Sequence, residues 1–212
     1  MKALIVVDVQ NDFLPGGALA VDGGDDIIPV LNDLLKYFDV VVATQDWHPP
    51  GHVSFAASHR DRRVGEKVSV GQVEQTLWPI HCVQGTHGAN FPETLKADGI
   101  DQVFRKATEP DRDYASGFQD SAREKSTGLA EYLRDRGVTD VYVCGIATDV
   151  CVRATVLDAL HLGFCTHLIR DACRAVNLNP GDEERAVKEM ANAGAEIVGA
   201  ADLLPKTNTR QT

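Results

Sequence analysis

Reactive side chains follow several apolar, strand-like segments of this sequence. Asp8 follows the run ALIVV, Lys106 closes QVFRK, and Cys151 lies a few residues beyond VYVCG. A thiol, a carboxylate and an ammonium group form the minimum set for covalent acyl transfer, with a nucleophile, a base and a charge partner. Cys151 also opens a helix-like segment, where partial positive charge favours thiolate over thiol. Each residue alone has an ordinary structural explanation, but together they predict a cysteine-dependent acyl transfer.

A second group has the side-chain types of a metal site. Asp46 and His48 are two positions apart after the run VVVAT, so an extended backbone points both side chains the same way. His81 is a candidate third ligand, and His52 a candidate fourth ligand or a residue behind the ligands. Two histidines and a carboxylate suit a divalent transition metal with open positions, zinc first, with iron or manganese as alternatives. Such a spacing also arises by chance in loops, so spacing alone leaves the site open.

The elements that must position these residues alternate between strand and helix patterns. Strands are expected, from their short apolar β-branched runs, at 3–7, 40–43, 102–104, 141–143, 165–169 and 196–198. Amphipathic helices are expected at 25–38, 127–136, 150–162 and 180–193, the last with Asn179 as its N-cap. This alternation predicts an α/β fold, a three-layer α/β/α sandwich around a central, mostly parallel sheet. Active sites in such sheets form beyond the carboxyl ends of the strands.

The organisation along the chain predicts a single domain over residues 1–204. A long segment at about 45–99 is rich in proline, glycine, histidine and charge without a clear period, and long loops of this kind are usually functional. Residues 205–212 read as a polar tail.

Composition narrows the partners and the compartment. The 212 residues carry a formal net charge of −10, which argues against nucleic acid and anionic membranes as partners. No apolar run approaches the length of a transmembrane helix, and the N-terminus reads as a strand rather than a signal peptide. The five cysteines are odd in number and lack a CxxC pair, which favours a reducing, cytoplasmic environment.

Six stretches together resemble nicotinamidases, within the isochorismatase-like cysteine hydrolases. They cover nearly the whole chain in family order, and DWHPPGHVSF together with WPIHCVQ is the most specific pair. The stretches are ALIVVDVQNDFLPGGALAV, VVATQDWHPPGHVSFA, LWPIHCVQGTHGANF, FRKATEPDRDYASGF, GIATDVCVRATVLDALHLGF and IRDACRAVN.

The resemblance implies a site and a reaction. It implies a cis peptide bond between Ile146 and Ala147, and an oxyanion hole formed by the N–H groups of Ala147 and Cys151. The implied reaction converts nicotinamide to nicotinic acid and ammonia through a thioester on Cys151, with pyrazinamide as an expected further substrate. The other implied roles are a catalytic triad of Asp8, Lys106 and Cys151, metal ligands Asp46, His48 and His81, and substrate-binding residues Phe13, Trp78 and Ile146.

Three departures from the family pattern and several alternatives remain at this stage. Val150 stands before the nucleophile, where many relatives have an aromatic residue or histidine, and the aromatic order around DYASGF differs from that of some relatives; both sites are expected near the pocket. Segment 56–76 is longer than in the shortest relatives and is expected to act as a lid or as part of a homo-oligomer contact. The main alternative function is a related cysteine amidase acting on another small amide, a carbamoyl compound or a lactam. An isochorismatase-type ether hydrolase and a non-catalytic interaction module are less favoured, because Cys151 and the other reactive positions are all present.

Overall fold

A six-stranded, all-parallel sheet forms the centre of the molecule. The structure, a computed structural model, describes residues 1–71 and 73–205. The sheet order is β5-β2-β1-β6-β7-β8. The predicted α/β/α architecture is thus confirmed, and all six predicted strands are present. The strands are β1 (Lys2–Val7), β2 (Val40–Asp46), β5 (Gln102–Lys106), β6 (Asp140–Ile146), β7 (Cys165–Arg174) and β8 (Glu196–Val198).

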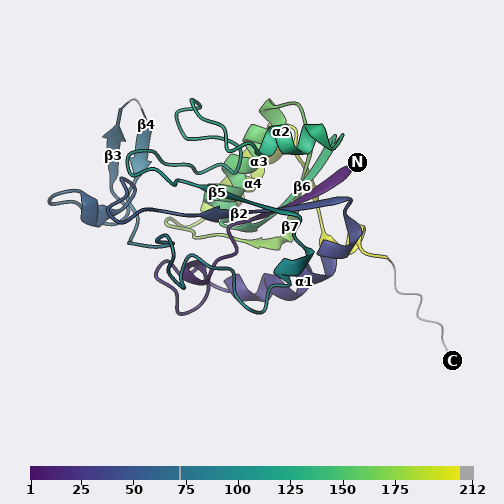
Figure 1. Cartoon of the computed structure of the whole chain (residues 1–212), viewed down its shortest axis with the longest axis horizontal. Coiled ribbons are helices and arrows are strands. Elements are labelled where there is room, and N and C mark those ends of the chain that lie inside the picture. The colour runs from purple at the N-terminus through teal and green to yellow at the C-terminus, as the bar shows by residue number, and fades with distance from the viewer. Residues whose placement is uncertain (72, 206–212) are drawn as a thin grey trace.

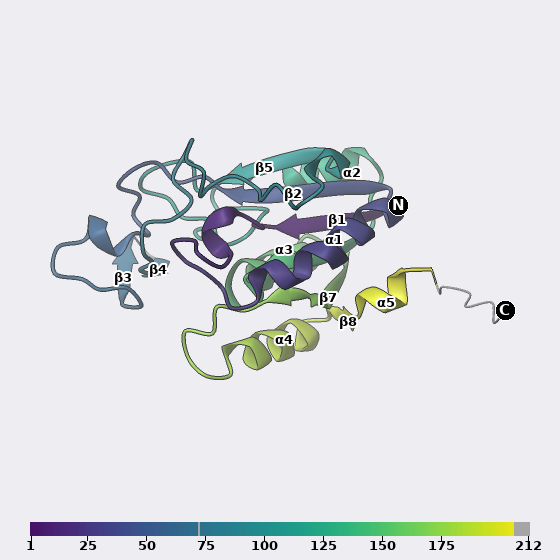
Figure 2. The same cartoon turned by 90° about the horizontal axis from the view of Figure 1, so that it is seen from below.

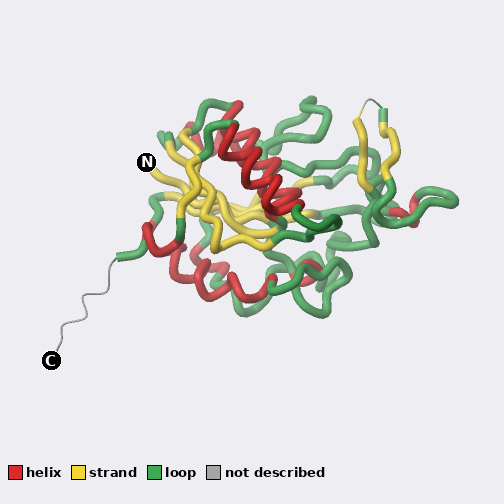
Figure 3. Tube along the Cα trace, turned by 180° about the vertical axis from the view of Figure 1, so that it is seen from behind, coloured by secondary structure: helices red, strands yellow, loops and turns green. Residues whose placement is uncertain are grey.

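Helices cover both faces of this sheet. In Figure 1, α2 (Leu129–Asp135), α3 (Arg153–His161) and α4 (Asp182–Asn192) lie above the sheet. Helices α1 (Ile28–Leu34) and α5 (Ala200–Leu203) lie below it, and Figure 3 shows the same layers from behind. Because both faces are covered, β2 is buried along its whole length and β1 from Ala3 onward. No helix among the described residues has the length and apolar character needed to cross a lipid bilayer.

Helix boundaries differ clearly from the sequence expectations in two places. The stretch predicted as a helix over 25–38 is broken into α1 flanked by 3₁₀ turns, Gly24–Ile27 and Leu35–Tyr37. The prediction of Asn179 as an N-cap is wrong. Helix α4 starts at Asp182 after Gly181, whose φ of 82° suits glycine, and Asn179 instead donates its backbone N–H to Asp182 Oδ2 at 2.7 Å.

The long segment at about 45–99 lies at the carboxyl edge of the sheet. It contains an antiparallel hairpin, β3 (Lys67–Val70) and β4 (Val73–Thr76), which the sequence analysis did not predict. Figure 2 shows this hairpin beyond the ends at which β1, β2 and β5 finish. Whether segment 56–76 acts as a lid or as a homo-oligomer contact stays a prediction. The predicted tail at 205–212 falls, except for Pro205, outside the described residues.

Candidate active site

Three neighbouring strands deliver three charged side chains to one point. Asp8 directly follows β1, Asp46 ends β2, and Lys106 ends β5. The register pairs Asp46 with Lys106, so their side chains leave the sheet at the same level. Asp8 itself has a φ of 48°, an uncommon left-handed conformation for a residue other than glycine. The parallel order β5-β2-β1 therefore brings together residues that lie far apart in the sequence.

Cys151 enters the same place from the end of β6. The peptide bond between Ile146 and Ala147 is cis, as the family resemblance implied. The chain then makes a π-type turn, Thr148–Val152, before α3 begins at Arg153. Gly145 permits the close approach of β6 to β1, since a Cβ there would lie 2.1 Å from the carbonyl oxygen of Val7. The nucleophile candidate thus sits in a π-turn rather than in the first turn of a regular helix.

Lys106 links the two carboxylates and the thiol. Its Nζ lies 3.0 Å from Asp8 Oδ2 and 3.6 Å from Cys151 Sγ, and it donates to the carbonyl oxygen of Tyr114 at 2.8 Å. Asp8 also accepts a hydrogen bond at 2.6 Å from the hydroxyl of Thr44. These groups are buried, so the lysine is held as a cation by the anions around it.

The pKa shifts of these groups follow from burial and mutual charge. Burial would lower the pKa of Lys106, but Asp46 and Asp8 outweigh it, and the pKa lies well above its ordinary value. Burial raises the pKa of Asp8 despite the opposing effect of Lys106. Burial, with the carboxylates of Asp8 and Asp46, also raises the pKa of the Cys151 thiol well above its ordinary value. Burial and the two anions therefore oppose the thiolate form that a helix start and Lys106 favour.

The two oxygens of the Asp46 carboxylate face different partners, Lys106 on one side and the two histidines on the other. Its Oδ1 accepts a hydrogen bond from Lys106, whereas its Oδ2 faces His48 Nε2 at 3.7 Å and His81 Nε2 at 3.8 Å. Burial opposes the ionised form, but Lys106 and His48 outweigh burial and hold the pKa of Asp46 well below its ordinary value. Tetrahedral zinc bond lengths would separate such nitrogen and oxygen ligands by about 3.4 Å. A metal ion fits between these atoms with a small adjustment.

The two histidines differ in their hydrogen bonding, and each leaves a ring nitrogen free for a metal ion. Both ring nitrogens of His48 are buried and have no hydrogen-bond partner, which is costly unless a ligand satisfies one of them. His81 Nδ1 donates to the carbonyl oxygen of Pro79 at 2.8 Å, which leaves the Nε2 lone pair facing Asp46. The three predicted ligands thus form one cluster of suitable chemistry.

Gln10 fixes the backbone of Asp46 through hydrogen bonds, and the sequence analysis did not identify Gln10 as a site residue. Its amide oxygen accepts from the backbone N–H of Asp46 at 2.8 Å, and its amide nitrogen donates to the carbonyl oxygens of Asp46 and Ala89. The side chain is fully buried. Gln10 lies in the quoted stretch VDVQNDF, but nothing in its local spacing points to a partner 36 residues away.

His52 lies next to the ligand cluster rather than in it. Its ring packs against that of His48 with centroids 4.3 Å apart. Its Nδ1 lies 2.8 Å from Ser54 Oγ, and its Nε2 donates to the carbonyl oxygen of Arg112 at 3.0 Å. Both nitrogens are therefore occupied, which favours a position behind the ligands over direct metal binding.

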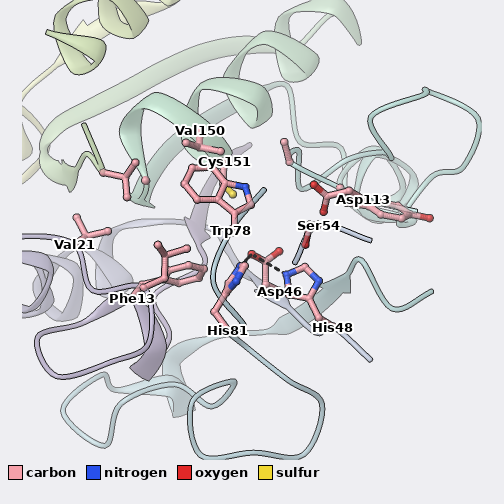
Figure 4. Close-up of a pocket in the computed structure, with 15 residues that line it drawn as sticks. Phe13, Val21, Asp46, His48, Ser54, Trp78, His81, Asp113, Val150 and Cys151 are labelled. Atoms are coloured by element: carbon pink, nitrogen blue, oxygen red, sulfur yellow. Dashed lines mark ion pairs between the residues drawn. The ribbon is translucent and has the colours of Figure 1, made fainter. Parts of the chain in front are cut away.

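One pocket joins the thiol to the metal-ligand cluster. Figure 4 shows Cys151 on one side and Asp46, between His48 and His81, on the other, with Phe13 and Trp78 bordering the same space. Ala147 also lines the pocket, whereas Asp8 and Lys106 lie behind its wall. The side chain of Ile146 is not among the lining residues. It packs in the core, with only 1% of its surface exposed.

Further residues line the pocket. Asp113, Tyr114 and Ala115 come from the stretch DYASGF, which the family resemblance placed near the pocket together with Val150, whereas Leu19, Val21, Ser54 and Val176 were not predicted. Val176 is held there by Asp149, whose two carboxylate oxygens accept the backbone N–H groups of Val176 and Asn177 at 2.9 and 2.8 Å. The walls are thus largely apolar around a few polar groups, as expected for a small, flat substrate.

Comparison with known proteins places this site in a family. The sequence matches the family model described as Isochorismatase domain over residues 2–202. It is 44% identical over 202 residues to the nicotinamidase of Acinetobacter baylyi, covering 95% of this chain and 94% of that protein. A solved structure described as Acinetobacter baumanii nicotinamidase pyrazinamidease has a TM-score of 0.93 and 46% identity, covering 96% of this chain and 98% of that one. The pyrazinamidase of Pyrococcus horikoshii, solved in complex with zinc, has a TM-score of 0.76 and 46% identity, covering 93% and 98%. On a match that spans nearly its whole length, the chain belongs to the isochorismatase family.

Proposed function

We propose that this chain hydrolyses nicotinamide to nicotinic acid and ammonia, with a covalent thioester on Cys151, and that it also accepts pyrazinamide. The observation that carries the proposal is the single pocket in which a buried thiol, with its lysine and carboxylate partners, faces an Asp-His-His cluster. The similarity to a nicotinamidase over 95% of the chain supports the choice of substrate.

Asp8 is proposed as the proton carrier of the reaction. It accepts the thiol proton of Cys151, and Sγ attacks the amide carbon as the carbonyl π electrons move to oxygen. Asp8 then gives the proton to the amide nitrogen as the C–N bond breaks and ammonia departs.

The thioester is then hydrolysed by the reverse order of proton movements. Asp8 removes a proton from the attacking water, and the tetrahedral intermediate expels Sγ, which takes that proton back as nicotinic acid leaves. Lys106 is proposed to position the Asp8 carboxylate and to stabilise the anionic states, since its Nζ lies close to both Asp8 and Cys151. The N–H groups of Ala147 and Cys151 are proposed to bind the oxyanion, an interaction whose loss typically costs on the order of 100-fold or more.

Asp46, His48 and His81 are proposed to hold one divalent transition metal, with zinc favoured because a relative was solved with zinc. When bound, this ion supplies an open coordination position for the ring nitrogen of the substrate. Phe13 and Trp78 are proposed to border the ring, while His52 supports His48 from behind. The proposed unit is the single domain at 1–204.

The test is release of ammonia and nicotinic acid from nicotinamide by the purified protein, with and without a strong chelator. Release that the chelator abolishes and zinc restores is the expected result. Benzamide, which lacks the ring nitrogen, is the matched control substrate and should react far more slowly. The proposal would fail if folded, zinc-loaded protein released no ammonia from nicotinamide but hydrolysed another amide. That result would support the alternative function, a related cysteine amidase.

A further inference from the structure

A second cluster of metal-ligand side chains lies at the amino-terminal ends of the strands, the amino edge of the sheet, opposite the carboxyl edge that carries the candidate active site. Asp140 is the first residue of β6, and Cys165 and His167 are the first and third residues of β7. Asp140 and Cys165 are register partners, and alternation along β7 puts His167 on the same face as Cys165. We propose that Asp140, Cys165 and His167 bind a divalent transition metal of the zinc type at a site separate from the candidate active site.

The spacing of these three groups fits a metal ion. Their ligand atoms all lie within 4.8 Å of one another, and Cys165 Sγ is 3.7 Å from His167 Nε2. Zinc bond lengths to sulfur and nitrogen, taken at a tetrahedral angle, separate the two ligand atoms by about 3.6 Å. The thiol and imidazole therefore already stand at the separation that a shared ion requires. A thiolate, an imidazole and a carboxylate together suit zinc. They do not suit magnesium or calcium, which prefer oxygen ligands only.

The ring of His167 is held in a ligand orientation. It is nine-tenths buried and stacks on Tyr142, with centroids 4.1 Å apart and planes 6° from parallel. Its Nδ1 lies 2.9 Å from Glu196 Oε2, although the groups are not aligned for a hydrogen bond, and Glu196 is its register partner on β8. A small rotation of the Glu196 carboxylate would let Nδ1–H donate to it, the arrangement of many zinc-binding histidines, and would leave the Nε2 lone pair for a metal ion shared with Cys165.

Charge around the cluster also favours a cation. Asp140 and Glu196 supply two carboxylates, and Thr139 donates its hydroxyl to one oxygen of Asp140 at 2.6 Å. Within the described residues, no lysine or arginine forms an ion pair with Asp140, and the ammonium of Lys2 lies over the Tyr142 ring, 5.5 Å from its centroid. The N-terminal ammonium of Met1 is a nearby cation that acts on Asp140. Metal binding would complete the site by displacing the Cys165 proton to solvent.

The competing explanation is a reactive thiol, because Cys165, His167 and Glu196 stand in the order of a nucleophile, a base and an orienting acid. Asp140 argues against it. Asp140 is the register partner of Cys165, and a carboxylate beside a thiol disfavours the free thiolate that a nucleophile needs. The same carboxylate adds a ligand to a metal site. Asp140 therefore makes sense in a metal site and not in a nucleophilic one.

Cobalt(II) titration of the metal-free, full-length protein tests the proposal. Cobalt bound to a thiolate gives an intense near-ultraviolet charge-transfer band, which Asp46, His48 and His81 cannot supply. The wild-type protein should develop this band, Cys165→Ser should lack it, and Cys151→Ala should retain it. Zinc stoichiometry should fall from about two equivalents to about one in Cys165→Ser, with unchanged circular dichroism. Nicotinamide hydrolysis by Cys165→Ser should also be unchanged, so failure of this proposal and failure of the proposed function are distinguishable.

Three results would overturn the assignment. The first is a wild-type protein that binds cobalt without the charge-transfer band. The second is a band that persists in Cys165→Ser, which would place the thiolate ligand elsewhere. The third is rapid alkylation of Cys165 that saturating zinc does not slow, since a coordinated thiolate is protected. That last result would identify Cys165 as a reactive thiol instead.

Discussion

The two edges of the central sheet carry similar side chains in different surroundings. At the carboxyl edge, Asp8, Asp46, Lys106 and Cys151 are buried, and every charge stands against an opposite one. At the amino edge, Cys165 and Glu196 are exposed, and His167 alone is deeply buried. At the amino edge a carboxylate, a thiol and a histidine form one cluster, whereas at the carboxyl edge Asp46 belongs to two clusters, one with His48 and His81 and one with Asp8 and Cys151.

The difference shows how burial determines whether a thiol with charged neighbours suits catalysis or only metal binding. A buried thiol between a lysine and a carboxylate can pass its proton to a defined acceptor while water is excluded. An exposed thiol with the same kind of neighbours exchanges its proton with solvent and gains little from them beyond ligand geometry. We therefore expect substitutions at the carboxyl edge to affect activity, folding or both, and those at the amino edge to affect only metal binding.

The largest expected effect is that of Cys151→Ala on turnover. Removing the proposed nucleophile should lower the rate of nicotinamide hydrolysis on the order of 10⁴-fold or more, because no thioester can form. Metal content and the free energy of unfolding should change little, since Ala removes only a sulfur at the pocket wall. Activity within tenfold of wild type would contradict the assignment of the carboxyl edge to catalysis, because the buried thiol would then not be the nucleophile.

Next comes loss of metal from the carboxyl edge in His48→Ala. This variant removes a ligand whose nitrogens have no protein partner, so the zinc content of this site and the affinity for nicotinamide should both collapse. Metal analysis and KM measure the two effects. His87→Ala, at an exposed histidine outside both clusters, is the matched control and should retain both. Equal metal content in the two variants would contradict the ligand assignment.

Lys106→Met tests the claim that paired charges stabilise the carboxyl edge. It leaves Asp8 and Asp46 buried without their cation, and breaking such a pair typically costs about 3–5 kcal/mol. Urea unfolding measures the loss. Lys36→Met removes an exposed lysine whose partner Asp33 is also exposed, and should cost well under about 1 kcal/mol. A similar cost for both variants would show that burial does not distinguish the two lysines.

Asp120 extends the comparison to a buried carboxylate outside the pocket. Burial opposes its charge, but the backbone N–H groups of Lys125 and Glu124 and the guanidinium of Arg112 outweigh burial and lower its pKa. Because the folded-state pKa lies below the unfolded value, its contribution is present above pH of about 3.9 and is lost as pH falls through the folded pKa. Asp120→Asn should therefore cost about 2 kcal/mol at pH 7 and progressively less in acid. A pH-independent difference in urea unfolding would contradict this account.

The smallest effect is expected from Glu196→Gln at the amino edge. It should weaken zinc binding at Asp140, Cys165 and His167 by about tenfold, because the carboxylate that orients His167 is lost. Activity and unfolding should stay at wild-type values, since Glu196 is largely exposed. Cobalt titration, followed through the thiolate band, measures the shift. A large loss of stability would show instead that Glu196 and His167 form an ion pair that stabilises the fold.

The alternation of apolar strands and amphipathic helices made much of this molecule predictable. Runs such as ALIVV and VVVAT form strands because their β-branched residues suit a sheet covered on both faces, and Asp8, Asp46 and Lys106 follow as the residues at strand ends. The hairpin Lys67–Thr76 was not predictable in the same way. Its strands are short and half-exposed, so they carry no continuous apolar run.

Residue types and local pattern thus determined the strands, the reactive residues at their ends and, through resemblance, the family. Only the tertiary structure decided which of those residues meet. The order β5-β2-β1 brings Lys106 to Asp46 across 60 residues, and Gln10 to Asp46 across 36. It also decided that burial raises the pKa of the Cys151 thiol, and that Asp140 lies beside Cys165 and His167. Contacts between strands depend on sheet order and register, and pKa values depend on burial; neither is a property of local sequence.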